Sequence, residues 1–306
     1  MGIVRRPTGA VTPIHGYLTS MTRIAFLGTG LLGSPMAARL AAAGHEVVAW
    51  NRTASKAEAL RTSGVLTAAT PTAAMQQSEC TILMLQDAPA IESALLTGEA
   101  AKALHGATVI QMGTIGPAES RRLAAAVAQR GGEYFEAPVL GSIPQAAAGT
   151  LQVMVGATAA QFARWRDLFA CFGEPVLAGD VGQAAALKLA LNQLIAALTG
   201  AFSFSLGLVR RSGLEVELFM RILRQSALYA PTFDKKLQRM LDREFGAPNF
   251  STRQMLKDVR LVLEEGRRLG LETASVDGLE RILLRALDRG HAEADYSALY
   301  EGVDPP

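Results

Sequence analysis

Short apolar runs alternate with longer amphipathic segments through the first half of the chain. Apolar runs of about five residues, bounded by turn residues, are typical of strands that are buried on both faces of a parallel sheet. The pattern predicts strands at residues 23–27, 46–50, 81–85, 108–112, 133–136 and 151–155, and helices at 31–43 and 117–130. Strands that alternate with helices in this way predict an α/β fold, a Rossmann-type doubly wound parallel sheet.

The pattern changes at Gly182, and from Gln183 onward no strand signal is found. An Ala/Leu-rich helix is expected from Gln183 to about Arg211, and further helices are expected at 215–226, 233–243, 252–269, 275–289 and 296–301. We therefore predict a Rossmann domain at 22–182 and an all-α C-terminal domain at 183–306, which the long interdomain helix joins. Pockets tend to form at such junctions.

The middle of the long helix, Leu189–Val209, carries no charged residue and is long enough to span a membrane. Polar side chains such as Asn192, Gln193 and Ser203 interrupt it, and each would be costly in lipid. We therefore expect a helix that is buried inside the protein, and no membrane partner.

Residues 1–21 differ in character from the rest of the chain. They include Arg5, Arg6, Pro7 and Pro13, and their hydrophobic residues follow neither a helical nor a strand periodicity. They also lack the apolar core of a secretion signal. We expect a flexible extension here, with a mis-set translation start or a transit peptide as alternatives. A cytoplasmic location is expected by default.

The composition excludes several classes of protein. The 30 Lys and Arg residues are scattered among 28 acids, for a net charge of +2, so no basic stripe favours nucleic acid as a partner. The two cysteines, Cys80 and Cys171, are far apart, and no two of the four histidines lie at metal-ligand spacing. We expect neither a disulfide framework nor a metal site.

A glycine-rich turn follows the first predicted strand and opens the first predicted helix. It consists of Gly28, Thr29, Gly30, Leu31, Leu32 and Gly33. In this context Gly28 permits a tight turn, Gly30 lets a pyrophosphate approach the backbone, and Gly33 lets the helix pack closely on the strand. The amides at the start of the helix would hold the phosphates. The turn therefore predicts that residues 22–182 bind a dinucleotide.

The end of the second predicted strand indicates which dinucleotide is bound. NAD sites usually place an acid there to bind the ribose hydroxyls, but this chain reads Asn51, Arg52 and Thr53. Arg52 can stack on adenine and pair with a 2′-phosphate, and Asn51 and Thr53 can add neutral hydrogen bonds. We predict NADP rather than NAD, with a solvated Arg52 as the alternative. Ligands should lie beyond the carboxyl ends of the strands, near Leu85, Gln86, Thr114 and 137–142.

Lys188 and Asn192 lie four residues apart within the long apolar helix, so they share one face of it. A lysine among alanines and leucines is costly unless it is partnered or points into a wet cleft. In such a cleft its ammonium can polarise a carbonyl as hydride arrives, or accept the alcohol proton in reverse. Asn192 could hold the substrate oxygen or keep the lysine in register. The alternative is a lysine that reaches out to solvent at the edge of the helix.

Four segments together resemble the β-hydroxyacid dehydrogenase family over residues 22–302, with the NADP-dependent glyoxylate/succinic semialdehyde reductase group as the most similar branch. They are the glycine turn with Asn51–Thr53, residues 136–142, Gly179 to Asn192, and Lys257–Asp258. The resemblance implies that Lys188 is the general acid/base and Asn192 its helper. It implies cofactor contacts from Thr114 and Lys257, and substrate contacts from Leu140, Gly141 and Ser142.

The chain departs from the family pattern at several positions. Leu140 replaces a serine, Gly113 precedes Thr114 in place of Ser-Thr, and Glu136 opens the substrate segment as in the semialdehyde reductases. The loss of the serine hydroxyl makes a bulkier or less polar substrate plausible.

These observations predict an NADP(H)-dependent enzyme that acts on a small aldehyde or keto acid, or on the matching β- or γ-hydroxy acid. An imine reductase-like enzyme and a non-catalytic NADP-binding module are the alternatives, and Lys188 counts against both. Apolar residues of the helical half, such as Phe202, Phe204, Leu206 and Leu208, are too many for one helix layer to bury. We therefore expect a homodimer or homotetramer.

Overall fold

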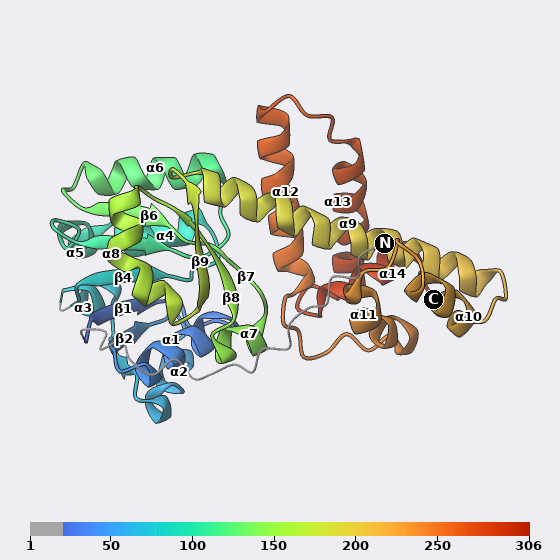
Figure 1. Cartoon of the computed structure of the whole chain (residues 1–306), viewed down its shortest axis with the longest axis horizontal. Coiled ribbons are helices and arrows are strands. Elements are labelled where there is room, and N and C mark those ends of the chain that lie inside the picture. The colour runs from blue at the N-terminus through green and yellow to red at the C-terminus, as the bar shows by residue number, and fades with distance from the viewer. Residues whose placement is uncertain (1–20, 77) are drawn as a thin grey trace, which may run out of the picture.

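The computed structural model describes residues 21–76 and 78–306, so the extension expected over residues 1–21 lies outside them except for Met21. A lobe built on a sheet and a lobe of helices lie at the two ends of the molecule, and the long helix α9 runs from one into the other (Figure 1).

The sheet has nine strands in the order β3-β2-β1-β4-β5-β6-β8-β7, and β9 pairs with β8. Pairing is parallel from β3 to β6, so the prediction of a Rossmann-type domain is confirmed. The strands are β1 (Arg23–Leu27), β2 (Glu46–Trp50), β3 (Leu66–Thr67), β4 (Cys80–Leu83), β5 (Thr108–Gln111), β6 (Glu133–Glu136), β7 (Val139–Leu140), β8 (Leu151–Gly156) and β9 (Gly173–Gly179).

The observed strands differ from the predicted ones in pairing and at their ends, and β3, β7 and β9 were not predicted. The sheet is not parallel throughout, because β8 pairs antiparallel with both β6 and β7. The third predicted strand, 81–85, is β4 and ends at Leu83, so Leu85 lies in the loop beyond it.

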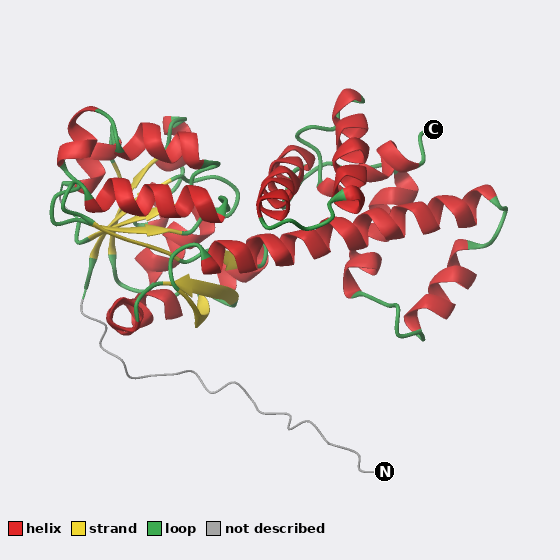
Figure 2. Ribbon diagram, turned by 90° about the horizontal axis from the view of Figure 1, so that it is seen from above, coloured by secondary structure: helices red, strands yellow, loops and turns green. Residues whose placement is uncertain are grey.

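Helices cover both faces of the sheet, as Figure 2 shows. They are α1 (Gly33–Ala42), α2 (Ala54–Glu58), α3 (Pro71–Met75), α4 (Ala88–Leu95), α5 (Gly98–Lys102), α6 (Pro117–Ala128), α7 (Ile143–Ala148) and α8 (Ala159–Ala170), with a 3₁₀ turn, η1, at Arg61–Ser63. Successive residues of β1 enter opposite cores, since Phe26 packs with Met36 of α1 and Leu27 with Ile91 of α4. Burial on both faces explains why the strands are continuous apolar runs.

The second half of the chain is helical, as predicted. It contains α9 (Gln183–Arg211), α10 (Val216–Arg224), α11 (Pro231–Asp242), α12 (Thr252–Arg268), α13 (Ala274–Asp288), the 3₁₀ turn η2 (Tyr296–Leu299) and α14 (Tyr300–Val303). One core cluster joins α9 to α12 and α13, which stand side by side across it in Figure 1, and another joins α9 to α10, α11 and α14.

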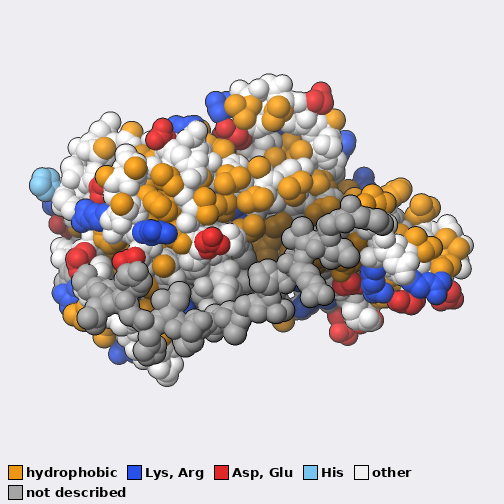
Figure 3. All heavy atoms as spheres, viewed as in Figure 1, with side chains coloured by type: hydrophobic (Ala, Val, Ile, Leu, Met, Phe, Trp, Pro, Cys, Tyr) orange, Lys and Arg blue, Asp and Glu red, His pale blue; other side chains and the backbone are white. Residues whose placement is uncertain are grey.

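By length and composition, α9 is the one described helix that could cross a membrane, and 44% of its most apolar window is buried inside the protein. Its inner face carries Lys188, Asn192 and Ser203, all buried. Its outer face exposes leucines and phenylalanine, and Figure 3 shows hydrophobic side chains gathered over it.

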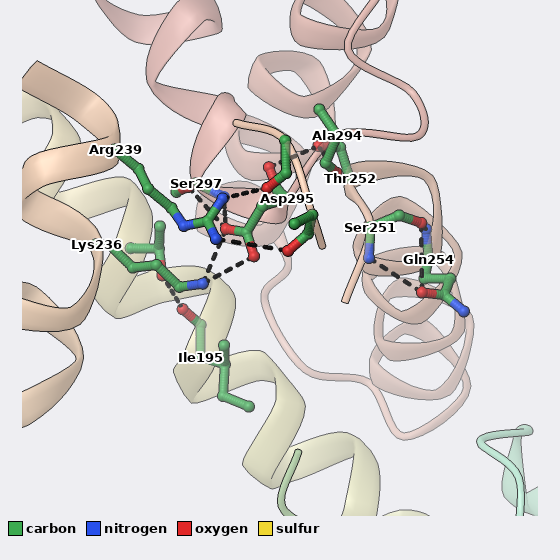
Figure 4. A network of polar contacts seen from close by, with 12 residues as sticks. Ile195, Lys236, Arg239, Ser251, Thr252, Gln254, Ala294, Asp295 and Ser297 are labelled. Atoms are coloured by element: carbon green, nitrogen blue, oxygen red, sulfur yellow. Dashed lines mark hydrogen bonds and ion pairs between the residues drawn. The ribbon is translucent and has the colours of Figure 1, made fainter. Parts of the chain in front are cut away.

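A buried ion pair holds α11 against η2 (Figure 4). Nζ of Lys236 lies 2.8 Å and 2.9 Å from the two carboxylate oxygens of Asp295, and 4.1 Å from the centre of the Tyr296 ring. Asp295 also accepts hydrogen bonds from the amide and hydroxyl of Ser297. Burial lowers the pKa of Lys236, and the pairing with Asp295 opposes this effect. This network stabilises the end of the chain against the helical core.

Candidate active site

The three glycines of the turn after β1 lie in three different steric environments. Gly28 has φ +106°, and a Cβ atom there would collide with the carbonyl oxygen of Met84. A Cβ atom at Gly33 would overlap the carbonyl oxygen of Gly28, whereas one at Gly30 would meet nothing within 4 Å. The first and third glycines therefore close the turn against the sheet, and the middle one leaves open space above it.

Thr29 gives this turn an unused hydrogen-bonding group. Its Oγ1 is buried and has no hydrogen-bond partner among the described residues, while its amide donates to Oδ1 of Asn51 at 3.1 Å and its carbonyl accepts from the Ser34 hydroxyl at 2.9 Å. A buried hydroxyl without a partner costs about 1–3 kcal/mol. The free hydroxyl, the open space at Gly30 and the amino end of α1 fit the pyrophosphate of a dinucleotide.

Of the three residues after β2, Asn51 is bonded within the protein, and Arg52 and Thr53 are exposed. Both groups of the Asn51 amide are used within the protein, because Nδ2 donates to the carbonyl of Thr53 at 2.9 Å. Asn51 thus ties this loop to the glycine turn. The side chains of Arg52 and Thr53 are exposed, and Arg52 forms no hydrogen bond or ion pair with any described residue.

The loops after β4 and β5 meet beside the turn. A Cβ atom at Gly113 would lie 2.7 Å from the carbonyl oxygen of Leu85, so the glycine allows these two loops to touch. Gln86 and Thr114 line a cleft of about 450 Å³ between the sheet and α12, together with Lys257. Nζ of Lys257 donates to the carbonyl of Thr114 at 2.6 Å. The structure therefore brings four of the predicted cofactor residues together: Leu85, Gln86, Thr114 and Lys257.

Lys188 lies in the second turn of α9 with only 9% of its surface exposed. It forms no hydrogen bond with any described residue. Burial lowers its pKa from 10.5 to about 8, while the nearby Asp258 carboxylate raises it and Lys257 lowers it further. A buried amine of this kind can release and take up a proton near neutral pH.

Asn192 is bound to the same carboxylate. Its Nδ2 donates to Oδ2 of Asp258 at 2.6 Å, and its own Oδ1 is buried with no hydrogen-bond partner in the part of the chain that the structure describes. Nζ of Lys257 lies 2.8 Å from Oδ1 of Asp258 and forms an ion pair with it. This oxygen accepts no hydrogen bond from any described residue. Asp258 is thus the centre of a cluster that contains Lys188, Asn192 and Lys257.

Asp258 was predicted only as the neighbour of Lys257. The signal that could have identified it is an acid on the apolar face of an amphipathic helix, since Met255, Val259 and Asp258 are all buried in α12. Such an acid requires partners. The predicted residues are also not all in one cavity, because Lys188 and Asn192 do not line the cleft that contains Lys257.

The predicted substrate segment forms β7 and the start of α7. The amide and hydroxyl of Ser142 both donate to Oε1 of Gln145, at 3.1 Å and 2.5 Å, so the donors expected of Ser142 are already used. Gly141 has φ +143°, and a Cβ atom there would lie 2.5 Å from a methyl carbon of Leu151. The described residues form no hydrogen bond between Leu140–Ser142 and the Asp258 cluster.

Two family models together cover almost the whole described chain. Residues 23–182 match the NAD binding domain of 6-phosphogluconate dehydrogenase, and residues 182–303 match the NAD-binding domain of NADP-dependent 3-hydroxyisobutyrate dehydrogenase. The chain is 30% identical to 2-hydroxy-3-oxopropionate reductase of Escherichia coli, over 92% of this chain and 97% of that protein. The chain belongs to the β-hydroxyacid dehydrogenase family.

Two further comparisons agree with this membership. The chain is 29% identical to glyoxylate/succinic semialdehyde reductase 1 of Arabidopsis thaliana, over 92% of this chain and 98% of that protein. The structure of 3-hydroxyisobutyrate dehydrogenase of Mycobacterium tuberculosis with L-serine has the same fold, with a TM-score of 0.82, 24% identity, and coverage of 92% and 98% of the two chains. As a β-hydroxyacid dehydrogenase, the protein is an oxidoreductase that uses a nicotinamide dinucleotide.

Proposed function

We propose that the protein is an NADP(H)-dependent oxidoreductase that transfers hydride between the nicotinamide ring and a small aldehyde or keto acid, or the matching β- or γ-hydroxy acid. The observation that carries this proposal is the buried amine of Lys188, with a pKa of about 8, beside Asn192 and Asp258. A general acid/base works best when its pKa lies near the working pH. Residues 22–182 hold the cofactor, and residues 183–306 complete the substrate site.

When it is bound, the cofactor supplies hydride for reduction and accepts it for oxidation. Lys188 donates a proton from Nζ to the carbonyl oxygen during reduction and takes the alcohol proton in the reverse direction. Asp258 favours the protonated form of Lys188 and orients Asn192, whose unpaired Oδ1 can accept a hydrogen bond from the substrate. Lys257 reaches from α12 to the loop that holds Thr114 and so covers the cofactor cleft.

The preference for NADP rests on the loop after β2. Arg52 is exposed and has no ion-pair partner among the described residues, and no acid stands at positions 51 to 53. A 2′-phosphate there meets a free guanidinium and no repulsion. We expect Arg52→Ala to raise KM for NADPH roughly tenfold or more and to leave KM for NADH within about twofold. Equal changes for both cofactors would contradict the assignment.

The substrate is small and carries a carbonyl or hydroxyl group, as the names of the two relatives indicate for those proteins. We assign Leu140, Gly141 and Ser142, at β7 and the start of α7, to the substrate side of the site on the family pattern. Leu140 gives this wall an apolar side chain, and the Ser142 donors are held by Gln145. This combination supports a less polar substrate than glyoxylate, such as succinic semialdehyde or a longer aldehyde.

We further propose a homodimer or homotetramer in the cytoplasm. The outer face of α9 exposes Leu187, Leu194, Leu198, Phe204 and Leu208 along one continuous stripe. Exposed apolar surface of this extent is typical of contacts between subunits. Light scattering tests the association, and Leu194→Glu with Phe204→Glu should shift the mass toward the monomer.

The central test is an assay of aldehydes and hydroxy acids with both nicotinamides, for wild type and Lys188→Ala. We expect the substitution to lower kcat about 10²- to 10⁴-fold, because general acid/base catalysis contributes that much. Lys235→Ala, an exposed lysine of α11, is the matched control. Unchanged turnover in Lys188→Ala would refute the role of the lysine.

The same assay separates the alternatives. Cyclic-imine turnover that matches or exceeds aldehyde turnover would favour an imine reductase-like enzyme. Tight binding of NADPH without turnover of any carbonyl compound would favour a non-catalytic module. Lys188 and its cluster support the dehydrogenase instead.

A further inference from the structure

A buried carboxyl group that the proposed reaction does not use lies beneath the first turn of α9. It belongs to Glu136, the last residue of β6, whose exposed fraction is 1%. Its Oε1 accepts hydrogen bonds from the amides of Gly182 at 2.8 Å and Ala185 at 2.9 Å. Its Oε2 lies against the hydroxyl of Ser120 in α6, which is in turn 2.9 Å from the Tyr134 hydroxyl. The side chain therefore joins the sheet, α6 and α9.

This arrangement supplies a cap that α9 lacks. The N-cap residue, Gly182, has no side chain with which to satisfy the free amides of the first turn. Glu136 does so from a distance of 46 residues along the chain.

The glycines around the start of α9 are closely packed against neighbouring side chains. A Cβ atom at Gly156 would lie 2.7 Å from Cγ and from Oε1 of Glu136. Gly182 has φ +96°, and a Cβ atom there would lie 2.6 Å from the guanidinium carbon of Arg121. Gly156 thus makes the space for the Glu136 side chain, and Gly182 lets Arg121 pack against the start of the helix.

We propose that Glu136 is a positioning residue for Lys188, and that its carboxylate fixes where the catalytic amine stands relative to the nucleotide-binding sheet. The proposal rests on the function proposed above for Lys188. Ala185, which the carboxylate binds, precedes Lys188 by three residues and shares its side of the helix. A displacement of about 1 Å at a reacting group can cost about 10²-fold in rate.

Three variants test the proposal, with kcat, KM for NADPH and thermal unfolding measured for each. Glu136→Ala removes the cap, and we expect kcat to fall about 10²-fold while KM for NADPH stays within about twofold. Glu136→Gln keeps an oxygen acceptor for the two amides and a donor for Ser120, so we expect it to recover most of that loss. Glu133→Gln, at the other end of the same strand and bound to Thr108, Gln161 and Arg164 rather than to α9, is the matched control and should keep the kcat and KM of wild type.

A second measurement does not depend on turnover. The pH dependence of acylation of Lys188, followed by mass spectrometry, reports its pKa directly. Burial is the main cause of the low pKa of Lys188, so a loosened first turn that admits water should raise it from about 8 toward 10.5 in Glu136→Ala. Glu136→Gln and Glu133→Gln should stay near 8.

The outcomes are distinct. If Glu136→Ala unfolds more easily but its kcat and the pKa of Lys188 equal those of wild type, the residue is only structural and the proposal is wrong. If Glu136→Ala does not fold, Gly156→Ala displaces the same side chain with a methyl group and should give the same two changes. If wild type has no turnover but the pKa moves as expected, the positioning role stands and the proposed function fails.

Discussion

The carboxylate of Asp258 should determine the pH at which the protein reduces a carbonyl compound. Asp258 is 3% exposed, and its charge raises the pKa of Lys188 against the effect of burial. Asp258→Asn keeps the shape of the side chain and removes the charge. The pKa of Lys188 should then fall below 8, because only desolvation and the positive charge of Lys257 remain.

An opposite charge close to an ionisable group changes its pKa by roughly one to three units. Reduction needs the protonated amine, so the alkaline limb of kcat/KM should move to lower pH by at least about one unit. For a change from about 8 to about 7, the protonated fraction at pH 7.5 falls from roughly 0.76 to roughly 0.24, a threefold loss at that pH. Oxidation needs the neutral amine, so its acid limb should move in the same direction.

The assay is a pH profile of kcat/KM from pH 5 to 10 in both reaction directions, with thermal unfolding to show that the variant is folded. Glu293→Gln is the control. It removes an exposed acid that pairs with Arg253, which lies on α12 as Asp258 does, and it should leave both limbs of the pH profile in place. A folded Asp258→Asn variant whose limbs coincide with those of wild type would refute the reasoning. It would mean that Asp258 does not act on Lys188.

Four further variants probe stability and cofactor binding. Lys188→Met should stabilise the fold by roughly 3 kcal/mol below pH 8. The pKa of Lys188 is about 8 in the folded state and 10.5 in the unfolded state, so folding opposes its charged form. Urea unfolding should show that this gain in stability disappears as the pH rises from 8 to 10.5. Gly30→Ala should fold normally and weaken NADPH binding in a fluorescence titration. Gly33→Ala should lower the unfolding temperature, because its Cβ atom would overlap the Gly28 backbone. Equal unfolding temperatures of the two variants would contradict this geometry. Asp295→Ala should cost about 3–5 kcal/mol in chemical unfolding because Lys236 is left buried without its partner, and a loss below about 1 kcal/mol would mean that water reaches the amine.

Most of the fold could be predicted from the sequence because β1, β2, β4, β5 and β6 are buried on both faces, so they stand out as short, largely apolar runs between the helices. The two-residue strand β3 is partly exposed and was not predicted. The strand β9 gave no such signal, because it contains Gly173 and Pro175 and exposes Val176 and Leu177. The short strand β7 was hidden for another reason, since its two residues owe their conformation to pairing with β8.

The site was predictable where chemistry and local pattern coincide. The glycine turn and Lys188 are visible as a fixed spacing and as a charge in an apolar helix. Glu136 and Asp258 were not assigned their contacts, because the Gly182 and Ala185 amides that bind Glu136 and the Asn192 amide that binds Asp258 lie 46 to 66 residues away in the chain. The engagement of Ser142 by Gln145 is a local contact three residues apart, which a capping pattern could have indicated.

The length of α9 has a consequence for how the molecule unfolds. Its first turn is held by the sheet through Glu136, and its last turn is held by Arg211, which bonds the Asp304 carboxylate at 2.5 Å. If either lobe unfolds, one end of α9 loses the contacts that hold it, and the other lobe packs against the same helix. We expect one calorimetric transition for the whole chain, with equal calorimetric and van't Hoff enthalpies. A fragment that starts at Gln183 should be a loose, partly folded chain.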